Sequence, residues 1–370
     1  MQNSATSLPK FGLNRFDYSS PRAFAKDARR AEELGWDCAY IPSSPLLAKD
    51  PYVNLAFAAV ATERIALGPL LENPVVRHPA VLASSIATID ALAPGRAILA
   101  YGVGDTAVRL LGKRPARVAE LEEAVRLTRG LLKGDGIDVG AAKPAILRHA
   151  RAVPVWIAAG GPRTLRMAGR IADGVFIRVG RHKANLEISI NAVRNGALEA
   201  GRNPDEVKIG LIFHTIMTDD PERAALMSRS MAAGYFEYSP MLFDQAGFVW
   251  DGPDVEELKK QVWPDFHHAA DLADSGRLVS FLSDEIAEAF ALFGTPDMIA
   301  ARKRIEDNDF PIHVSPAEGK LLQILIKMSG VKKCVEIGTL GGYSTLWIAD
   351  SLPDDGQLFT CEHDEKRLRL

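Results

Sequence analysis

Short apolar runs alternate with amphipathic segments over most of this chain. Apolar positions at helical spacing, such as the face that runs from Phe24 to Leu34 behind a Ser20-Pro21 start, predict helices. Further helices are predicted at 54–62, 82–89, 118–132, 163–172 and 184–200. The apolar runs between them predict seven strands, at 10–16, 38–42, 65–71, 97–101, 153–158, 175–179 and 207–213.

Repeated strand–helix units place parallel strands under covering helices, which predicts an α/β fold. A closed (β/α)8 TIM barrel needs eight strands and about 250 residues. An open doubly wound sheet is the alternative, but no glycine-rich dinucleotide fingerprint follows the first strand. The pattern therefore favours the barrel.

The rhythm breaks at 219–283, where the stretches 235–250 and 263–268 are aromatic-rich and are predicted to be irregular. Such an insertion either shapes the active site or serves packing and dimerisation. Helices are predicted again at 284–293 and 296–305. The eighth strand is expected at 310–314, where Pro311 suits a central strand poorly, so that the barrel is either left open or completed by the strands that follow.

Composition narrows the class of protein. The net charge of -3 and the 25% of charged residues argue against nucleic acid or an anionic membrane as a partner. No apolar run reaches the ~18 residues that cross a bilayer, and residues 1–10 lack a signal-peptide pattern. Cys38, Cys334 and Cys361 show no metal-ligand spacing, and three thiols cannot form a closed disulfide set. We expect a soluble cytoplasmic protein without a metal site.

Five stretches, in order and spacing, resemble the luciferase-like monooxygenase family, in particular its branch of deazaflavin-dependent methylenetetrahydromethanopterin reductases. They are RIALGPLLENPVVRHP at 64–79, ATIDALAPGR at 87–96, YGVGD at 101–105, AAGGP at 158–162 and AGRIADGV at 168–175. The likeness covers about residues 10–310. It implies a bacterial luciferase-like TIM barrel that binds FMN or deazaflavin coenzyme F420 at the carboxyl ends of its strands. The implied activity is that of an oxidoreductase or monooxygenase that acts on a small organic substrate, usually as a homo-oligomer.

The resemblance also suggests where the cofactor lies. It implies a non-prolyl cis peptide between Leu70 and Leu71, which forms a bulge behind the ring. Gly102 and Gly104 follow the fourth predicted strand, where backbone can approach a flat ring, and Gly160 and Gly161 follow the fifth, where it can hold a phosphate. Plain turns would also explain both pairs. Asn73 either reaches the cofactor edge or caps its own loop. The full set of candidate cofactor residues in the barrel is Leu70, Leu71, Asn73, Gly102, Gly104, Gly160, Gly161, Arg163 and Thr164.

Polar residues near the expected strand ends are candidates to face the substrate. They are Asn14, Ser43, Ser44, Glu72 and His267, which is followed by His268. The related reductases carry acidic residues on the first strand, where this chain has Asn14-Arg15-Phe16, and many members carry an aspartate where it has Ser43-Ser44. We therefore expect a substrate other than methylenetetrahydromethanopterin. Arg77, His78 and Asp173 are expected to be structural.

A second pattern begins near residue 311. Residues 315–322 read as a capped helix, and a strand at 333–338 leads into a glycine turn, a helix and a strand that ends at Glu362. The stretch VEIGTLGGYS at 335–344 resembles the S-adenosylmethionine (SAM) loop of class I O-methyltransferases of the caffeoyl-CoA type. That likeness implies contacts to SAM from Glu336, Gly338, Tyr343, Ser344 and Glu362.

The methyltransferase likeness covers only about 60 residues, and its later strands would lie beyond Leu370. The sequence thus predicts a barrel at 1–310 and a partial Rossmann-like β-α-β segment at 311–370. We expect that segment to be an inert remnant that does not methylate by itself. Three hypotheses remain open: a flavin- or deazaflavin-dependent oxidoreductase, a SAM-dependent O-methyltransferase, and a non-catalytic fusion.

Overall fold

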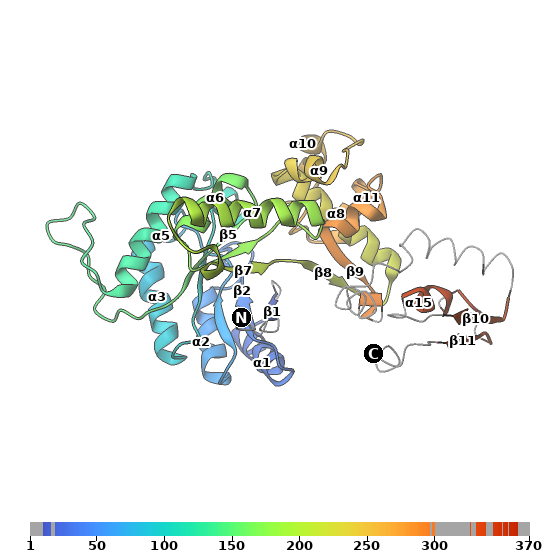
Figure 1. Ribbon diagram of the computed structural model, residues 1–370, viewed down its shortest axis with the longest axis horizontal. Coiled ribbons are helices and arrows are strands. Elements are labelled where there is room, and N and C mark those ends of the chain that lie inside the picture. The colour runs from blue at the N-terminus through green and yellow to red at the C-terminus, as the bar shows by residue number, and fades with distance from the viewer. Residues whose placement is uncertain are drawn as a thin grey trace, which may run out of the picture. The chain divides into compact units, whose positions relative to one another are not determined.

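The structure is a computed structural model that describes residues 10–15, 19–296, 298–299, 326, 331–337, 343–349, 351–353 and 355–361. Its chain divides into two compact units, which are described separately below. Unit 1 comprises Met1–Val179 and Lys183–Ile212, and unit 2 comprises Gly180–His182 and Phe213–Leu370. Figure 1 labels most of the helices and strands of both.

Among its described residues, unit 1 contains seven strands, and these pair with one another in parallel. They form one sheet in the order β1-β2-β3 and another in the order β4-β5-β6-β7. Isolated parallel bridges, Leu67 with Ala97 and Glu72 with Tyr101, join β3 to β4. The strands are β1 (Gly12–Asn14), β2 (Cys38–Ile41), β3 (Ala66–Pro69), β4 (Leu99–Tyr101), β5 (Val155–Ala159), β6 (Gly174–Ile177) and β7 (Lys208–Leu211). All seven strands predicted in this part of the sequence are confirmed, although each is shorter than expected.

Helices follow the strands of unit 1, and most begin at a proline. The Ser20 hydroxyl accepts a hydrogen bond from the Ala23 N–H, and the Asp50 carboxylate accepts from the N–H groups of Tyr52 and Val53. This cap lets the second helix start at Pro51, three residues earlier than predicted. The helices are α1 (Pro21–Glu33), α2 (Pro51–Ala61), α3 (Pro79–Leu92), α4 (Thr106–Arg109), α5 (Val118–Lys133), α6 (Pro162–Ile171), α7 (Lys183–Glu199) and the 3-10 turn η1 (Pro204–Glu206).

An apolar cluster of strand residues lies at the centre of unit 1. Tyr40, Leu70, Ala100, Ala158 and Phe176 are its buried members, and Leu71 and Trp156 pack against them. The Trp156 ring lies 4.5 Å from the Phe176 ring, and the Tyr40 ring meets the Phe176 ring edge-on at 5.4 Å. Because these residues come from β2, the end of β3, β4, β5 and β6, the cluster fixes those strands against one another.

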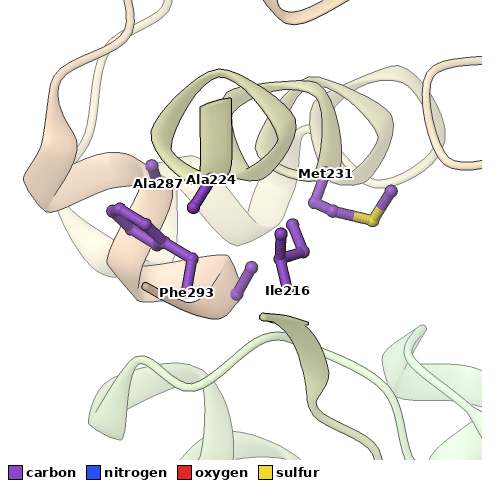
Figure 2. Packing of buried hydrophobic residues seen from close by; sticks show 6 residues of the cluster. Ile216, Ala224, Met231, Ala287 and Phe293 are labelled. Carbon is purple, nitrogen blue, oxygen red and sulfur yellow. The ribbon is translucent and has the colours of Figure 1, made fainter. Parts of the chain in front are cut away.

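Unit 2 is built around a parallel pair of strands under a long helix. β8 (His214–Met217) pairs with β9 (Ala291–Gly294), and α8 (Pro221–Tyr238) packs on both. Figure 2 shows Ala224 of α8 pointing toward the strand side of the cluster, with Phe293 of β9 on one side of it, Ile216 of β8 below and Met231 on the other side. The remaining elements are α9 (Met241–Ala246), α10 (Val255–Leu258), the turn η2 (Lys259–Gln261), α11 (Leu272–Leu278) and α12 (Asp284–Phe290).

Two predictions for this region are wrong in part. The stretch 235–250, expected to be irregular, holds the end of α8 and all of α9. The helix predicted at 284–293 ends at Phe290, because Ala291 turns extended (φ -142°) and the next residues pair with β8. The stretch 263–268 is non-helical, as expected, and contains a cis Trp263–Pro264 bond. The strand predicted at 310–314 and the helix at 315–322 lie outside the described residues.

The end of the chain forms the predicted β-α-β segment. β10 (Lys333–Ile337) and β11 (Gln357–Cys361) pair in parallel, with Val335 opposite Phe359, and α15 (Tyr343–Ala349) lies between them in sequence. Across the residues that the structure describes, no helix combines the length and apolar character needed to cross a membrane.

Candidate functional site

The carboxyl ends of β2, β3 and β4 come together in unit 1. The Leu70 N–H donates to the Ile41 carbonyl (2.9 Å), and the Glu72 N–H donates to the Ala100 carbonyl (2.8 Å). The Gly102 N–H in turn donates to the Glu72 carbonyl (2.9 Å). Residues beyond the end of β3 are thus held between the two neighbouring strands. The peptide bond between Leu70 and Leu71 is cis, as the resemblance implied.

Two predicted glycines allow close packing at this edge. A Cβ on Gly102 would lie 2.7 Å from a methyl carbon of Leu71, so that any side chain there would displace Leu71. Gly104 has φ +75°, and a Cβ there would lie 2.9 Å from Asn73 Cγ. Asn73 is buried, and its side-chain oxygen accepts from the N–H groups of Val75 and Val76. Asn73 therefore caps its own loop, which is one of the two roles considered for it.

Glu72 is the fully buried acid of this region. Arg77 Nε lies 3.6 Å from Glu72 Oε1, and neither carboxylate oxygen has a well-aligned hydrogen bond. Burial raises the pKa of Glu72 to about 7, against the opposing pull of the Arg77 charge and of the nearby Ser43 hydroxyl. Glu72 is therefore partly protonated near neutral pH, where an exposed glutamate is almost fully ionised.

The connection from β2 to α2 supplies the groups around Glu72. Ser43 and Ser44 are both buried, and the Ser44 hydroxyl has no hydrogen-bond partner. The Tyr52 hydroxyl is buried without a partner as well, and burial followed by the negative charge of Glu72 raises the pKa of Tyr52. Arg77 pairs with Asp50 and lies over the Tyr52 ring, 5.4 Å from its centre. Sequence reasoning missed Asp50 and Tyr52, for which the only signal was an Asp-Pro helix start.

The predicted phosphate-binding turn lies at the end of β5. A Cβ on Gly160 would lie 2.7 Å from the Arg178 carbonyl oxygen, so that the chain needs glycine there. Gly161, by contrast, faces open space at the N-cap of α6. Arg163 is exposed and Thr164 half-buried in the first helical turn. The start of α6, the open space at Gly161 and the Arg163 side chain thus lie next to one another. A phosphate site at this turn would need this arrangement.

Three residues expected to be structural make contacts that fix the local structure. His78 Nδ1 accepts from the Ala80 N–H and caps α3. Asp173 accepts from the Val155 N–H (2.8 Å) and pairs with Arg129 (2.7 Å), which fixes the turn before β6. Arg77 joins the connections on both sides of α2, as described above.

The other candidate residues belong to other elements. Asn14 is exposed at the end of β1, opposite Tyr40 in register. His267 belongs to unit 2, where it stacks on His214 (5.4 Å between ring centres) and meets Tyr235 edge-on. Its neighbour His268 contacts Asp265 through Nδ1 (2.8 Å). Among the residues suggested for SAM, Glu336 lies on β10, and Tyr343 and Ser344 open α15. Gly338 and Glu362 lie outside the described residues.

Comparison with protein families identifies the larger part of the chain. The luciferase-like monooxygenase model matches residues 4–307. This chain belongs to the luciferase-like monooxygenase family. An O-methyltransferase model matches residues 299–370, in agreement with the second resemblance.

Individual relatives agree with this assignment. The chain is 30% identical over 305 residues to a 5,10-methylenetetrahydromethanopterin reductase of Methanolobus tindarius, covering 79% of this chain and 89% of the relative. It is 34% identical over 236 residues to an F420-dependent glucose-6-phosphate dehydrogenase of Nocardia farcinica, covering 57% and 70%.

Solved structures support the fold. The coenzyme F420-dependent tetrahydromethanopterin reductase of Methanopyrus kandleri matches with a TM-score of 0.63 and 26% identity, over 80% of this chain and 88% of that one. An F420-dependent secondary alcohol dehydrogenase matches with a TM-score of 0.61 over the same shares, at 19% identity. The predicted TIM-barrel fold is confirmed. The expected class, a flavin- or deazaflavin-dependent oxidoreductase, is confirmed too.

Proposed function

We propose that this family member uses deazaflavin coenzyme F420, rather than FMN, to transfer hydride to or from a small organic substrate. The observation that carries the proposal is the packing of Leu70 and Leu71 against Gly102, which builds an apolar support at the ends of β3 and β4. The choice of deazaflavin rests on the relatives, since the proteins named above depend on F420 or reduce a methanopterin.

The residues present fit such a cofactor. Gly161 leaves open space at the start of α6, where backbone N–H groups and Arg163 can hold a phosphate, with Thr164 beside them. Leu70 and Leu71 offer apolar contact to a flat ring, and we propose that Gly102 and Gly104 contribute backbone to the same edge, where they leave room for Leu71 and Asn73. Asn73 acts on the cofactor only indirectly, because it fixes the loop that follows Leu71.

The bound cofactor would supply the hydride donor or acceptor, and the protein would supply orientation and proton control. We propose that Ser43, Ser44 and Glu72 act together, because the structure places them at adjoining strand ends. The serine hydroxyls can orient a polar substrate group, and Glu72 can hold or release the accompanying proton. Asn14 and His267 remain further proposed contacts to substrate. The Asn14-Arg15 end of β1 supports a substrate other than methylenetetrahydromethanopterin.

Fluorescence titration of the purified protein tests this proposal, with F420, FMN and SAM as separate ligands. We expect saturation by F420 at micromolar concentration and much weaker binding of FMN. Tighter binding of FMN would overturn the choice of deazaflavin. Binding of neither cofactor, in protein shown to be folded by circular dichroism, would contradict the oxidoreductase proposal.

We propose the same two parts that the sequence suggested, an oxidoreductase part at 1–310 and a methyltransferase-like segment at 311–370. The family matches and the parallel pairing of β10 with β11 support this division. A SAM site formed by Glu336, Gly338, Tyr343, Ser344 and Glu362 is the second candidate function. Saturable SAM binding in the same titration would support it.

We also propose a cytoplasmic homo-oligomer that pairs through the outer face of α2. The helix contains no charged residue, yet Val53, Phe57 and Val60 are exposed along one stripe. A helix that is apolar on its buried and its outer face is typical of an interface. The neighbouring helix α3 adds exposed Val81 and carries only the buried Asp90 as a charge.

A further inference from the structure

The charged groups around Glu72 connect the buried end of β3 to the surface. Glu72 is fully buried, and its Oε1 lies 3.6 Å from Arg77 Nε. The same guanidinium pairs with Asp50, whose side chain is 41% exposed. A single arginine therefore lies between a buried acid and a surface acid.

The main chain and the side chain of Glu72 differ in how well they are fixed. Its N–H and carbonyl are both hydrogen-bonded to the β4 segment, at 2.8 and 2.9 Å. Its carboxylate oxygens have no well-aligned hydrogen bond, and the buried hydroxyls of Ser44 and Tyr52 have no partner. Because leaving a buried polar group unsatisfied is unfavourable, a bound proton or an ordered water is expected at Glu72.

We propose that Glu72, Arg77 and Asp50 form a proton-controlled brace for the Leu70–Leu71 end of β3, so that one proton on Glu72 weakens cofactor binding. The inference rests on the proposed function, because it needs the cofactor ring beside Leu70 and Leu71. Ionised Glu72 attracts Arg77 and holds it between the two acids. Protonated Glu72 leaves Arg77 to Asp50 alone, and the end of β3 loses its charged support. Glu72 acts here as a positioning residue.

The surrounding groups determine the direction of the effect. Ser43 and Asp50 face Glu72 from the β2–α2 connection, Tyr52 from α2, Tyr101 from β4 and Arg77 from the following loop. Burial raises the pKa of Glu72 to about 7, Arg77 opposes this, and the Asp50 charge adds to it. Although burial alone would raise the pKa of Asp50, hydrogen bonds from Arg77 and from the Val53 backbone lower it, so that Asp50 remains ionised. The brace is therefore intact above neutral pH and lost below it.

The test is the dissociation constant of F420 at pH values on both sides of neutrality. In the unaltered chain, affinity should fall as the pH drops through about 7. If binding shifts the Glu72 pKa by about one unit, the ionised and protonated forms differ about tenfold in affinity. Glu72→Gln keeps the shape but cannot ionise, and its affinity should not change with pH.

A second variant separates this brace from a merely structural role. Asp50→Asn removes the charge that raises the Glu72 pKa, so the midpoint should move to lower pH, while asparagine still caps α2. Glu120→Gln, at an exposed acid on α5, is the matched control and should keep the original profile. The inference would be overturned if Glu72→Gln kept the pH dependence of the unaltered chain, or if the midpoint of Asp50→Asn stayed at the original pH.

Infrared difference spectra of the cofactor-free protein distinguish failure of this inference from failure of the proposed function. A protonated carboxyl band that appears near neutral pH and is absent in Glu72→Gln supports titration of this residue without any ligand. If F420 binds but no such band appears, the inference fails and the proposed function stands. If F420 binds at no pH, the proposed function fails and the inference fails with it.

Discussion

Gly102 sets the distance between the ends of β3 and β4, because the Leu71 side chain occupies the space where its Cβ would lie. We expect Gly102→Ala to displace Leu71 and to weaken cofactor binding about tenfold, since overpacking typically costs about 1–3 kcal/mol. Titration with F420 measures this. Gly136→Ala is the control, because the nearest atom to its Cβ would be 3.4 Å away in an exposed loop. Equal affinity of the two variants would show that the Leu71–Gly102 contact does not support the cofactor.

At this scale, sequence reasoning found the residues that act through backbone and also named Glu72, but it missed Asp50 as a charged partner of Arg77. Leu70, Leu71, Gly102 and Gly104 belong to motifs with a recognisable family pattern. Asp50 is different, because its proline neighbour explains it completely as a helix cap. Nothing in the sequence shows that its second oxygen meets Arg77, which lies 27 positions further along the chain.

Glu32 ties α1 to the turn that leads into β3. Its carboxylate accepts from the backbone N–H groups of Glu63, Arg64 and Ile65, at 2.5–3.1 Å. Burial alone would raise the Glu32 pKa, but these three donors and the Arg64 charge lower it. We expect Glu32→Gln to destabilise the fold by about 1.5–3 kcal/mol at neutral pH, the usual worth of hydrogen bonds to a charged group.

The stability that Glu32 contributes should depend on pH. Because the folded-state pKa of Glu32 is lowered, its contribution is complete above the unfolded value of about 4.3 and is lost as the pH falls below it. Urea unfolding should therefore separate the variant from the unaltered chain at neutral pH but not in acid. Glu33→Gln, at an exposed neighbour on α1, should change stability by less than about 1 kcal/mol. A difference between Glu32→Gln and the unaltered chain that persisted in acid would contradict this account.

Whole elements were predictable where caps and periodicity agreed. The starts of α1, α3 and α6 follow from their proline and cap positions, and the strands of unit 1 follow from short apolar runs. β9 was not predictable, because its residues continue the apolar spacing of α12 and only pairing with β8 makes them a strand. In the same way, the aromatic residues at the end of α8 predicted an irregular stretch. In the structure Tyr235 packs against Phe290, and Phe236 packs against Phe243.

For the whole molecule, the outer stripe of α2 predicts the assembly state. We expect Phe57→Lys to place a charge in the proposed interface and to shift the protein toward monomer. Light scattering after size-exclusion chromatography measures the mass. Val139→Lys, at an exposed apolar residue of the loop after α5, is the control and should leave the mass unchanged. A Phe57→Lys protein with the mass of the unaltered chain would exclude this face of α2 as the interface.

Trp156 gives the barrel part a spectroscopic property of its own. Its indole packs on Phe176 in the same cluster that contains Leu70 and receives Leu71. A chromophore held at those leucines would therefore lie within easy range of resonance energy transfer from this indole. Trp250, by contrast, stacks on Phe236 in unit 2, at 4.3 Å. Among its five tryptophans the chain thus carries one donor that would report on its cofactor.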